Sequence, residues 1–290
     1  MEFASPTVFR KPVYLQYHPA YNRVFGRVVQ EAISFHKMKS ALSAHRFIEP
    51  ITIAIDGPPG AGKTTFARRF ANYVNLTMRG LLAVYVFQMD YFLSGMNRKL
   101  DASGLRALPP EKYTDPAFWY RFDDVDFLTQ SLRSIRTGDN VILRGLHEPK
   151  TDRFDKELMI SYPENRYPLF VIEGVYSLHE RFTENVDLGI FFWSGEWLRH
   201  AQYTFRAKMR GSGDQERAEV LYDLSNRCYL SYLENGFEKY IDLLAVIDKI
   251  DLRGESEYRG PIIQKLDGTG WSRFLNIVAS EIEAGSPVKA

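Results

Sequence analysis

One short segment constrains this chain more than any other. Residues 57–64 read G-P-P-G-A-G-K-T, which matches the pattern G-x-x-x-x-G-K-[ST] of a phosphate-binding loop, the P-loop. The β-branched run at residues 51–55 precedes this loop and predicts a buried strand. The residues after the loop place apolar side chains on one face of a predicted helix, at Ala67, Phe70, Ala71 and Val74. A strand, this loop and a helix, in that order, indicate a site for a polyphosphate.

The residue types within the loop have a chemical purpose. Its glycines allow backbone N–H groups to turn toward an anion, and the start of the next helix adds a favourable dipole. We expect Lys63 to reach the β- and γ-phosphates and Thr64 to ligate Mg²⁺. A nucleoside triphosphate would therefore be bound by Gly57, Pro58, Pro59, Gly60, Ala61, Gly62, Lys63, Thr64 and Thr65.

Composition narrows the classes of protein that this chain can belong to. Its 290 residues are 45% hydrophobic and 25% charged, as in ordinary globular proteins with a full core. A formal net charge of +1 argues against a general nucleic-acid-binding surface. The single cysteine, Cys228, excludes an internal disulfide and is expected to be a small buried residue. No signal peptide and no apolar run long enough for a bilayer are visible, so we expect a cytoplasmic protein without a membrane segment.

Short apolar runs alternate with helical patterns along the middle of the chain. This alternation predicts an α/β fold of the P-loop NTPase type, with a parallel sheet covered by helices on both faces. Between the strands, the polar residues 90–120 carry several glycines and prolines and are expected to form a functional loop. The expected strands lie at residues 51–55, 81–87, 141–143, 168–173, 188–192 and 243–247.

Both ends of the chain lie outside this pattern. We expect an N-terminal helical extension over residues 1–49, a core over 50–255 and a C-terminal helical tail over 256–290. Within the extension, apolar spacing in residues 21–45 predicts a helix packed on the core, with docking of a partner as the alternative. The tail is expected to pack either on the core or on the second subunit of a homodimer.

Acidic residues stand at the end of one predicted strand and shortly after the end of another. Ligands of open parallel sheets gather at the carboxyl ends of the strands, so these residues are expected to face the P-loop. Asp90 could take the proton of a hydroxyl group that attacks a γ-phosphate, or it could merely cap a helix or a turn. Glu173 could hold Mg²⁺ directly or through water, or it could be a solvent-facing residue.

A row of basic residues follows the strand at 188–192. Arg199, Tyr203, Arg206 and Arg210 share one face of a predicted helix, which ends in a glycine-rich break at residues 211–213. Guanidinium groups above a phosphate site could neutralise a phosphoryl group in transfer and exclude water. We therefore expect a lid around residues 196–217, with a solvated basic face as the alternative.

Several sequence blocks, in order, resemble the uridine kinase/phosphoribulokinase-like family of P-loop small-molecule kinases. The resemblance covers roughly residues 51–250 and rests on the order of the blocks. Residues 90–92 resemble the D-x-F segment of the family, 122–127 its F-D-x-P-x-A segment near the substrate, and 171–176 its E-G block. The region 206–210 corresponds to the lid, and 239–244 resembles the K-x-Y-A-D block that precedes the last strand.

This resemblance implies roles for particular residues. It implies that ATP and Mg²⁺ are used, with Thr64 and Glu173 as metal ligands. Catalytic roles fall on Asp90 as the base and on Lys63, Arg206 and Arg210. Contacts to the acceptor substrate fall on Tyr91, Phe92, Asp123, His147 and Arg153.

The chain also departs from the pattern of this family. Val125 replaces a proline, and the Tyr-Asp-Phe that contacts a nucleoside in uridine kinases is missing, although His147 could stand in for the histidine nearby. Arg144, Lys150 and Arg153 could suit an acceptor with an anionic group, or they could be exposed loop charges.

The leading hypothesis is an ATP-dependent kinase that phosphorylates a hydroxyl group of a nucleoside, sugar, polyol or sugar acid. One alternative is a nucleoside monophosphate kinase, because residues 55–60 also resemble the opening of cytidylate kinase. A kinase of a nucleic-acid hydroxyl group would need a basic groove, which the balanced charge does not support. A regulatory P-loop ATPase is a further alternative, although residues 248–251 lack the Asn of a guanine-specificity motif.

Overall fold

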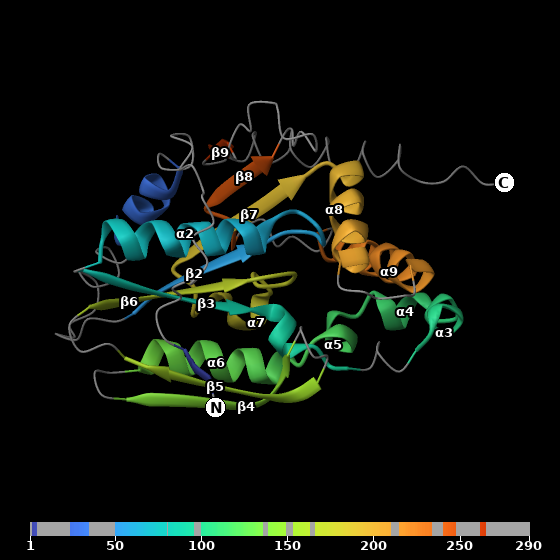
Figure 1. The fold of residues 1–290 in the computed structure, drawn as a ribbon, viewed down its shortest axis with the longest axis horizontal. Coiled ribbons are helices and arrows are strands. Elements are labelled where there is room, and N and C mark those ends of the chain that lie inside the picture. The colour runs from blue at the N-terminus through green and yellow to red at the C-terminus, as the bar shows by residue number, and fades with distance from the viewer. Residues whose placement is uncertain are drawn as a thin grey trace.

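The structure is a computed structural model in which the central part of the chain is described almost continuously. A parallel sheet lies at its centre, with helices on both faces and a second, smaller sheet beyond one of these helices (Figure 1). The described residues are 2–4, 24–34, 50–79, 81–95, 100–135, 139–148, 153–162, 166–209, 215–233, 240–247 and 262–264.

The central sheet has the strand order β3-β6-β2-β7-β8-β9. All of its neighbouring strands are parallel except β8 and β9, which pair in the antiparallel direction. This arrangement confirms the predicted α/β fold and adds an antiparallel edge strand to it. The strands are β2 (Ile51–Asp56), β3 (Leu82–Gln88), β6 (Tyr167–Glu173), β7 (Leu188–Ser194), β8 (Leu243–Ile247) and β9 (Ile262–Gln264).

Helices connect these strands. The long helices are α2 (Lys63–Thr77), α6 (Phe122–Ser134), α8 (Glu196–Met209) and α9 (Gln215–Leu233). The segment expected to be an irregular loop holds a series of short helices, in which Asp115 and Pro110 act as local start signals. The short helices are η1 (Met89–Phe92), α3 (Ala102–Arg106), α4 (Pro110–Tyr113), α5 (Pro116–Trp119) and, further along the chain, α7 (Glu180–Thr183).

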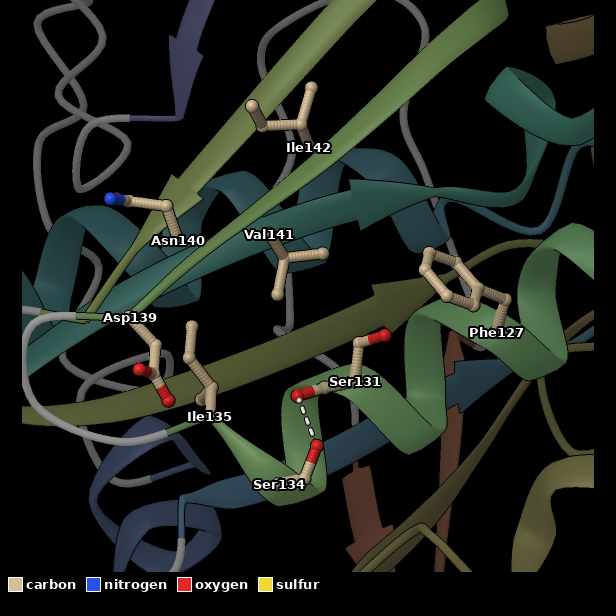
Figure 2. Close-up of a pocket in the computed structure, with 8 residues that line it drawn as sticks. All are labelled: Phe127, Ser131, Ser134, Ile135, Asp139, Asn140, Val141 and Ile142. Carbon is tan, nitrogen blue, oxygen red and sulfur yellow. Dashed lines mark hydrogen bonds between the residues drawn. The ribbon is translucent and has the colours of Figure 1, made fainter.

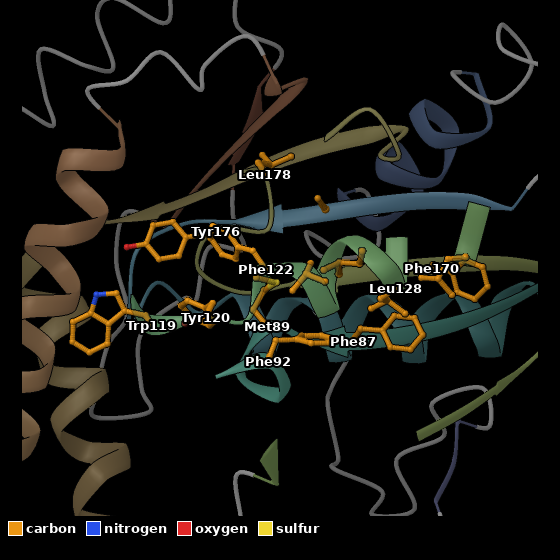
Figure 3. Packing of buried hydrophobic residues seen from close by; sticks show 14 of the residues in the cluster. Phe87, Met89, Phe92, Trp119, Tyr120, Phe122, Leu128, Phe170, Tyr176 and Leu178 are labelled. Carbon is orange, nitrogen blue, oxygen red and sulfur yellow. The ribbon is translucent and has the colours of Figure 1, made fainter. Parts of the chain in front are cut away.

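The central sheet is buried on both faces, which explains its nearly continuous apolar strands. On one face, Val84 and Val171 pack in a cluster with α2 and the helix over residues 24–34. On the other face, Phe87 and Phe170 pack with Leu128 of α6 (Figure 3). The aromatic part of this second cluster continues past the strand ends toward α9, so the core extends beneath the loops that follow the strands.

The second sheet is a hairpin with one added strand. It consists of β4 (Asn140–Glu148), β5 (Arg153–Ser161) and β1 (Glu2–Ala4), in the order β1-β5-β4. The prediction that residues 141–143 belong to the parallel sheet is wrong, because β4 pairs with β5 in the antiparallel direction. One side of the hairpin packs into the core cluster of α6 through Leu143, Leu146 and Leu158. Its other side carries charged residues.

The N-terminal helix over residues 24–34 packs on α2, as predicted. Phe25 is 1% exposed and its ring lies 5.3 Å from that of Phe66, 5.8 Å from that of Phe70 and 5.5 Å from that of Tyr73. The expected C-terminal helix at residues 271–282 lies outside the described residues. No helix in the described part of the chain is both long and apolar enough to cross a bilayer.

We predict that Phe25→Ala lowers the free energy of unfolding by about 3–5 kcal/mol, because it leaves a cavity among three aromatic rings. Leu76→Ala on α2 is the control, since Leu76 is 66% exposed and its truncation should change stability by no more than about 0.5 kcal/mol. Urea denaturation of both variants is the measurement. Equal stability of the two variants would show that the N-terminal helix adds nothing to the core.

Candidate functional site

The P-loop is held against the backbone of two neighbouring elements. Gly57 follows β2 with a φ of 151°, and Gly60 has a φ of 77°. A Cβ atom would lie 2.1 Å from the carbonyl oxygen of Phe192 at the first position and 2.3 Å from that of Arg199 at the second. Only glycine can pass this close to backbone oxygens with these dihedral angles. The loop is therefore clamped by β7 and by the first turn of α8.

Lys63 begins α2 and folds back over its own loop. Its Nζ donates hydrogen bonds to the carbonyl oxygens of Gly57, at 2.7 Å, and Pro58, at 2.8 Å. The residue is only 7% exposed. The ammonium group therefore lies at the centre of the loop, where the sequence predicts the phosphates.

The register of the central sheet brings Glu173 beside the P-loop. Glu173 ends β6 and pairs with Ile55 of β2 on one side and with Gln88 of β3 on the other. It is 3% exposed, and the side chain of Thr64 forms a hydrogen bond with it. The alternative of a solvent-facing glutamate is thereby excluded. The expected metal ligands Thr64 and Glu173 are in direct contact.

Asp90 completes this group of polar residues. It lies in η1, the short helix directly after β3, whose N-cap is Gln88, so Asp90 does not occupy the cap position. The pKa of Glu173 is raised to about 7, first because the carboxyl group is buried and second because of the negative charge of Asp90, while the charge of Lys63 and the Thr64 hydrogen bond lower it. Asp90 and Glu173 thus face the same small volume.

The donor set at this position fits Mg²⁺. One hydroxyl oxygen and one or two carboxylates, with phosphate oxygens and water, are the ligands that Mg²⁺ takes in phosphate-binding sites. Thr64 and Glu173 supply this set, with Asp90 nearby. Within the described ranges no three His, Cys, Asp or Glu side chains cluster as a dedicated metal cage.

A buried carboxylate at Asp56 was not predicted from the sequence. Asp56 is 0% exposed, lies at the end of β2 and accepts hydrogen bonds from loop residues and from α9. Its Oδ1 accepts from the N–H of Gly57 at 2.6 Å, the N–H of Tyr176 at 3.0 Å and the hydroxyl of Tyr229 at 3.0 Å. Its Oδ2 accepts from the N–H of Leu178 at 2.9 Å. The strand pattern offered no signal for these partners, since three of them lie far along the chain.

His147 connects the β4–β5 hairpin to Asp90. Its Nδ1 lies 2.8 Å from the backbone carbonyl oxygen of Asp90, and its ring packs against Phe154 at 5.3 Å. His147 is 1% exposed, which leaves it almost no surface for a substrate. Through its contact with the carbonyl oxygen of Asp90, His147 instead stabilises η1.

The other residues of the D-x-F segment have different environments. Phe92 is 0% exposed and belongs to the core cluster. Its side chain therefore anchors the segment in the core and has no surface for a substrate. Tyr91 is half-buried, with the Nζ of Lys156 over its ring at 4.7 Å from the centroid. Lys156 also forms an ion pair with Glu148 at 2.8 Å. The hairpin thus covers Tyr91 with a buried, charge-compensated lysine.

Three further candidates lie in exposed positions. The Asp123 carboxylate accepts a hydrogen bond from Arg181 at 2.6 Å, and its side chain is 91% exposed. Arg153 is exposed at the start of β5 and pairs in register with Glu148. Thr65 is exposed in the first turn of α2, next to Thr64.

The predicted arginine stripe on α8 begins inside the protein. Arg199 is 1% exposed, its guanidinium donates to Asn226 of α9, and it stacks on Trp193 at 4.6 Å. The expectation that Arg199 belongs to a lid over phosphate is therefore wrong. The ring of Tyr203 packs on α9. Arg206 lies within α8, and its side chain, like Arg210, is outside the described part of the chain.

A hollow of about 330 Å³ lies between α6 and β4, away from the P-loop (Figure 2). None of the predicted site residues lines it. Its wall combines the exposed side chains of Phe127 and Ile142 with polar groups. We therefore assign the chemistry to the strand ends and not to this hollow. The lining residues are Phe127, Ser131, Ser134, Ile135, Asp139, Asn140, Val141 and Ile142.

Comparison with solved structures supports the fold. A protein from Silicibacter sp. TM1040 that is assigned as a fructose transport system kinase is 22% identical, with a TM-score of 0.50, over 73% of this chain and 94% of that chain. D-glycerate 3-kinase from Cryptococcus neoformans var. grubii is 13% identical, with a TM-score of 0.54, over 83% of this chain and 99% of that chain. Among curated proteins, none matches the sequence.

The family model of the phosphoribulokinase/uridine kinase family matches residues 52–238, which is more than half of the chain. This range begins in β2, includes the P-loop, Asp90 and Glu173, and ends after α9. The chain therefore belongs to the phosphoribulokinase/uridine kinase family and is a P-loop kinase, a phosphotransferase with an alcohol group as its acceptor.

Proposed function

We propose that this protein transfers the γ-phosphoryl group of ATP to a hydroxyl group of a small polyhydroxy compound, such as a sugar, polyol, sugar acid or nucleoside. One observation carries the proposal: Lys63, Thr64, Glu173 and Asp90 come together at the carboxyl ends of three adjacent strands. A phosphate cradle alone would fit any nucleotide-binding protein. A carboxylate beside it supplies what the transfer to an alcohol needs.

The donor half of the site consists of the P-loop and Lys63. Backbone N–H groups of the loop and the start of α2 would bind the phosphates, as their position and dipole favour. Lys63 would exchange its bonds to Gly57 and Pro58 for bonds to phosphate oxygens. In this position its charge stabilises the negative charge that moves onto the leaving group.

The acceptor half depends on Asp90. Its carboxylate would take the proton of the acceptor hydroxyl as the oxygen forms a bond to the γ-phosphorus and the bond to the β-phosphate oxygen breaks, which releases ADP. His147 would hold η1, and so Asp90, at the correct distance through the backbone carbonyl. Tyr91 would line the acceptor side, and Asp123 and Arg153 would contact larger acceptors from the rim.

Mg²⁺, held by Thr64 and Glu173, would neutralise charge on the phosphates. Arg206, within α8, and Arg210, which follows it in the sequence, would neutralise the phosphoryl group and exclude water. Phosphoryl transfer requires mainly positioning and charge neutralisation, and these residues provide both.

Ion pairs on the β4–β5 hairpin bear on the choice of acceptor. Lys156 is bound to Glu148, and Arg144 lies 3.3 Å from Glu157. These carboxylates already compensate the cations, whereas a nucleotide phosphate as acceptor would need cations of its own. The contacts favour an alcohol acceptor over a nucleoside monophosphate. The proteins of similar fold, whose names refer to fructose and D-glycerate, make sugars and sugar acids the first compounds to test.

The test of this function is a screen for ATP-dependent phosphorylation of sugars, polyols, sugar acids and nucleosides, with products identified by mass spectrometry. We expect ADP release to increase strongly with one acceptor class and the product to be a phosphate ester. A product with a new phosphoanhydride bond on a nucleotide would contradict the assignment of Asp90. Slow hydrolysis that no acceptor accelerates would favour the regulatory ATPase.

We predict that Asp90→Asn lowers kcat by roughly 10²- to 10⁴-fold, because the amide cannot take the proton of the acceptor. The affinity for ATP should remain close to that of the wild type, since the P-loop is unchanged. Asp101→Asn is the matched control, because Asp101 caps α3, accepting from Gly104 N–H at 2.7 Å, and should leave kcat nearly unchanged. Full turnover by Asp90→Asn would remove Asp90 from the mechanism.

We predict that the apparent affinity for Mg²⁺ rises with pH near neutrality. The pKa of Glu173 is raised to about 7, so below this value the carboxyl group is protonated and is a poor metal ligand. Mg²⁺ titrations of ATP turnover at about pH 6 and about pH 8 should differ by roughly 10-fold in half-saturating Mg²⁺. Glu173→Gln should need more Mg²⁺ and lose this dependence. An identical Mg²⁺ requirement of the wild type at both values would contradict the role of Glu173.

A further inference from the structure

The carboxylate of Asp56 joins three separate parts of the fold. Through Gly57 it holds the first residue of the P-loop, and through Tyr176 and Leu178 it holds the segment directly after Glu173. Through Tyr229 it holds α9. All four partners are donors, so a group that only accepts hydrogen bonds fits this position.

The contacts of Asp56 with Gly57 and with the segment after Glu173 both affect the donor site. The N–H of Gly57 is bound to Asp56, while the carbonyl oxygen of Gly57 receives Lys63. A shift of Gly57 would therefore move the acceptor of the lysine. The bonds from Tyr176 and Leu178 fix the backbone a few residues after Glu173. Beyond the pairing of β2 with β6, one carboxylate thus ties the first residue of the phosphate cradle to the segment that follows the predicted metal ligand.

The contact of Asp56 with α9 connects the donor site to further elements, because α9 has contacts of its own. Asn226 of the same helix accepts from Arg199 on α8, and the guanidinium of Arg217 donates to the carbonyl oxygen of Leu100, just before α3. Near the start of α9, Glu216 pairs with Arg106 of α3 at 2.6 Å. The helix that Asp56 holds at Tyr229 therefore also contacts α8 and the segment that leads to the acceptor side.

The surroundings of the Asp56 carboxyl group determine whether it carries a negative charge. The pKa of Asp56 is raised to about 6, because the effect of burial exceeds the lowering by the hydrogen bonds from Leu178 and Gly57, the charge of Lys63 and the hydrogen bond from Tyr229. The group is thus ionised at neutral pH. An asparagine would place an N–H₂ donor against at least one of the four donors, which leaves a buried bond unmade.

We propose that Asp56 is a positioning residue of the donor site, which fixes the P-loop relative to Glu173 and connects both to α9. This inference rests on the proposed function, because it assumes that the cradle binds ATP. It assigns a role to a residue outside the P-loop pattern, and that role acts through Gly57 and Glu173 without contact to the reacting atoms.

The first test is Asp56→Asn, measured by equilibrium titration with ATP and Mg²⁺ and by steady-state kinetics. We expect ATP binding to weaken by roughly 10-fold or more, since buried donors lose their acceptor. The KM of the acceptor should stay within about 2-fold, because Asp90 and His147 are untouched. Asp187→Asn is the control: Asp187 accepts from the N–H of Thr52 at 2.7 Å at the other end of β2, so its loss should lower stability without changing ATP affinity.

The second test uses two buried tyrosines of the same aromatic cluster. Tyr229→Phe removes a hydroxyl that donates to Asp56, whereas Tyr85→Phe on β3 removes one that donates to the carbonyl oxygen of Ser161 at 3.1 Å. Both changes delete one buried hydroxyl and conserve the ring. We expect Tyr229→Phe to weaken ATP binding by roughly 3-fold or more, and Tyr85→Phe to leave it unchanged at a similar loss of stability.

The outcomes separate the two proposals. A wild-type protein that does not bind ATP refutes the proposed function. ATP binding by the wild type together with unchanged binding by folded Asp56→Asn overturns the positioning role. If Asp56→Asn does not fold, the tyrosine pair decides, and equal ATP affinities of Tyr229→Phe and Tyr85→Phe overturn the role as well.

Discussion

The direct pairing of β6 with both β2 and β3 is the constraint on which the site depends. Parallel strands that are neighbours in a sheet end at the same edge, so residues distant in sequence meet there without any special loop. Glu173 pairs with Ile55 and Gln88, and the chain continues from these strands into the P-loop and into η1. A slip of one residue in this register would turn Glu173 to the opposite face of the sheet. The burial of both faces opposes such a slip, so the hydrophobic core also maintains the chemistry.

Much of this could be predicted because the relevant signals are local. The P-loop pattern can be recognised from the residues around Lys63 alone, and the nearly continuous apolar strands predict a sheet that is buried on both faces. Asp90 and Glu173 followed from the rule that ligands gather at the carboxyl ends of strands. The sequence alone could not show whether Asp90 caps a helix, because that depends on the position of Gln88 as the N-cap of the short helix. It also placed His147 and Phe92 at the substrate, since spacing does not show how deeply a side chain is buried.

The features that were missed depend on long-range contacts. Asp56 looked like the last residue of a strand, and its partners Tyr176, Leu178 and Tyr229 lie 120, 122 and 173 residues further along the chain. Arg199 shares a helical face with Arg206, but periodicity cannot tell whether the start of that face meets solvent or Asn226. Residues 141–143 of β4 were predicted to be a strand of the parallel sheet, and β5 was missed, since charged residues interrupt the apolar alternation of the hairpin and its register shifts around Leu146.

The bonds of Lys63 to its own loop affect which ligands the cradle selects. Because the ammonium group already has two carbonyl acceptors, an incoming anion gains only the difference between new and old hydrogen bonds. A single weakly charged oxygen is hardly better than a carbonyl group, whereas a polyphosphate offers several anionic oxygens at once. The loop thus competes with its ligand for the same cation. This internal competition sets a threshold that favours triphosphates over the small anions that surround any protein.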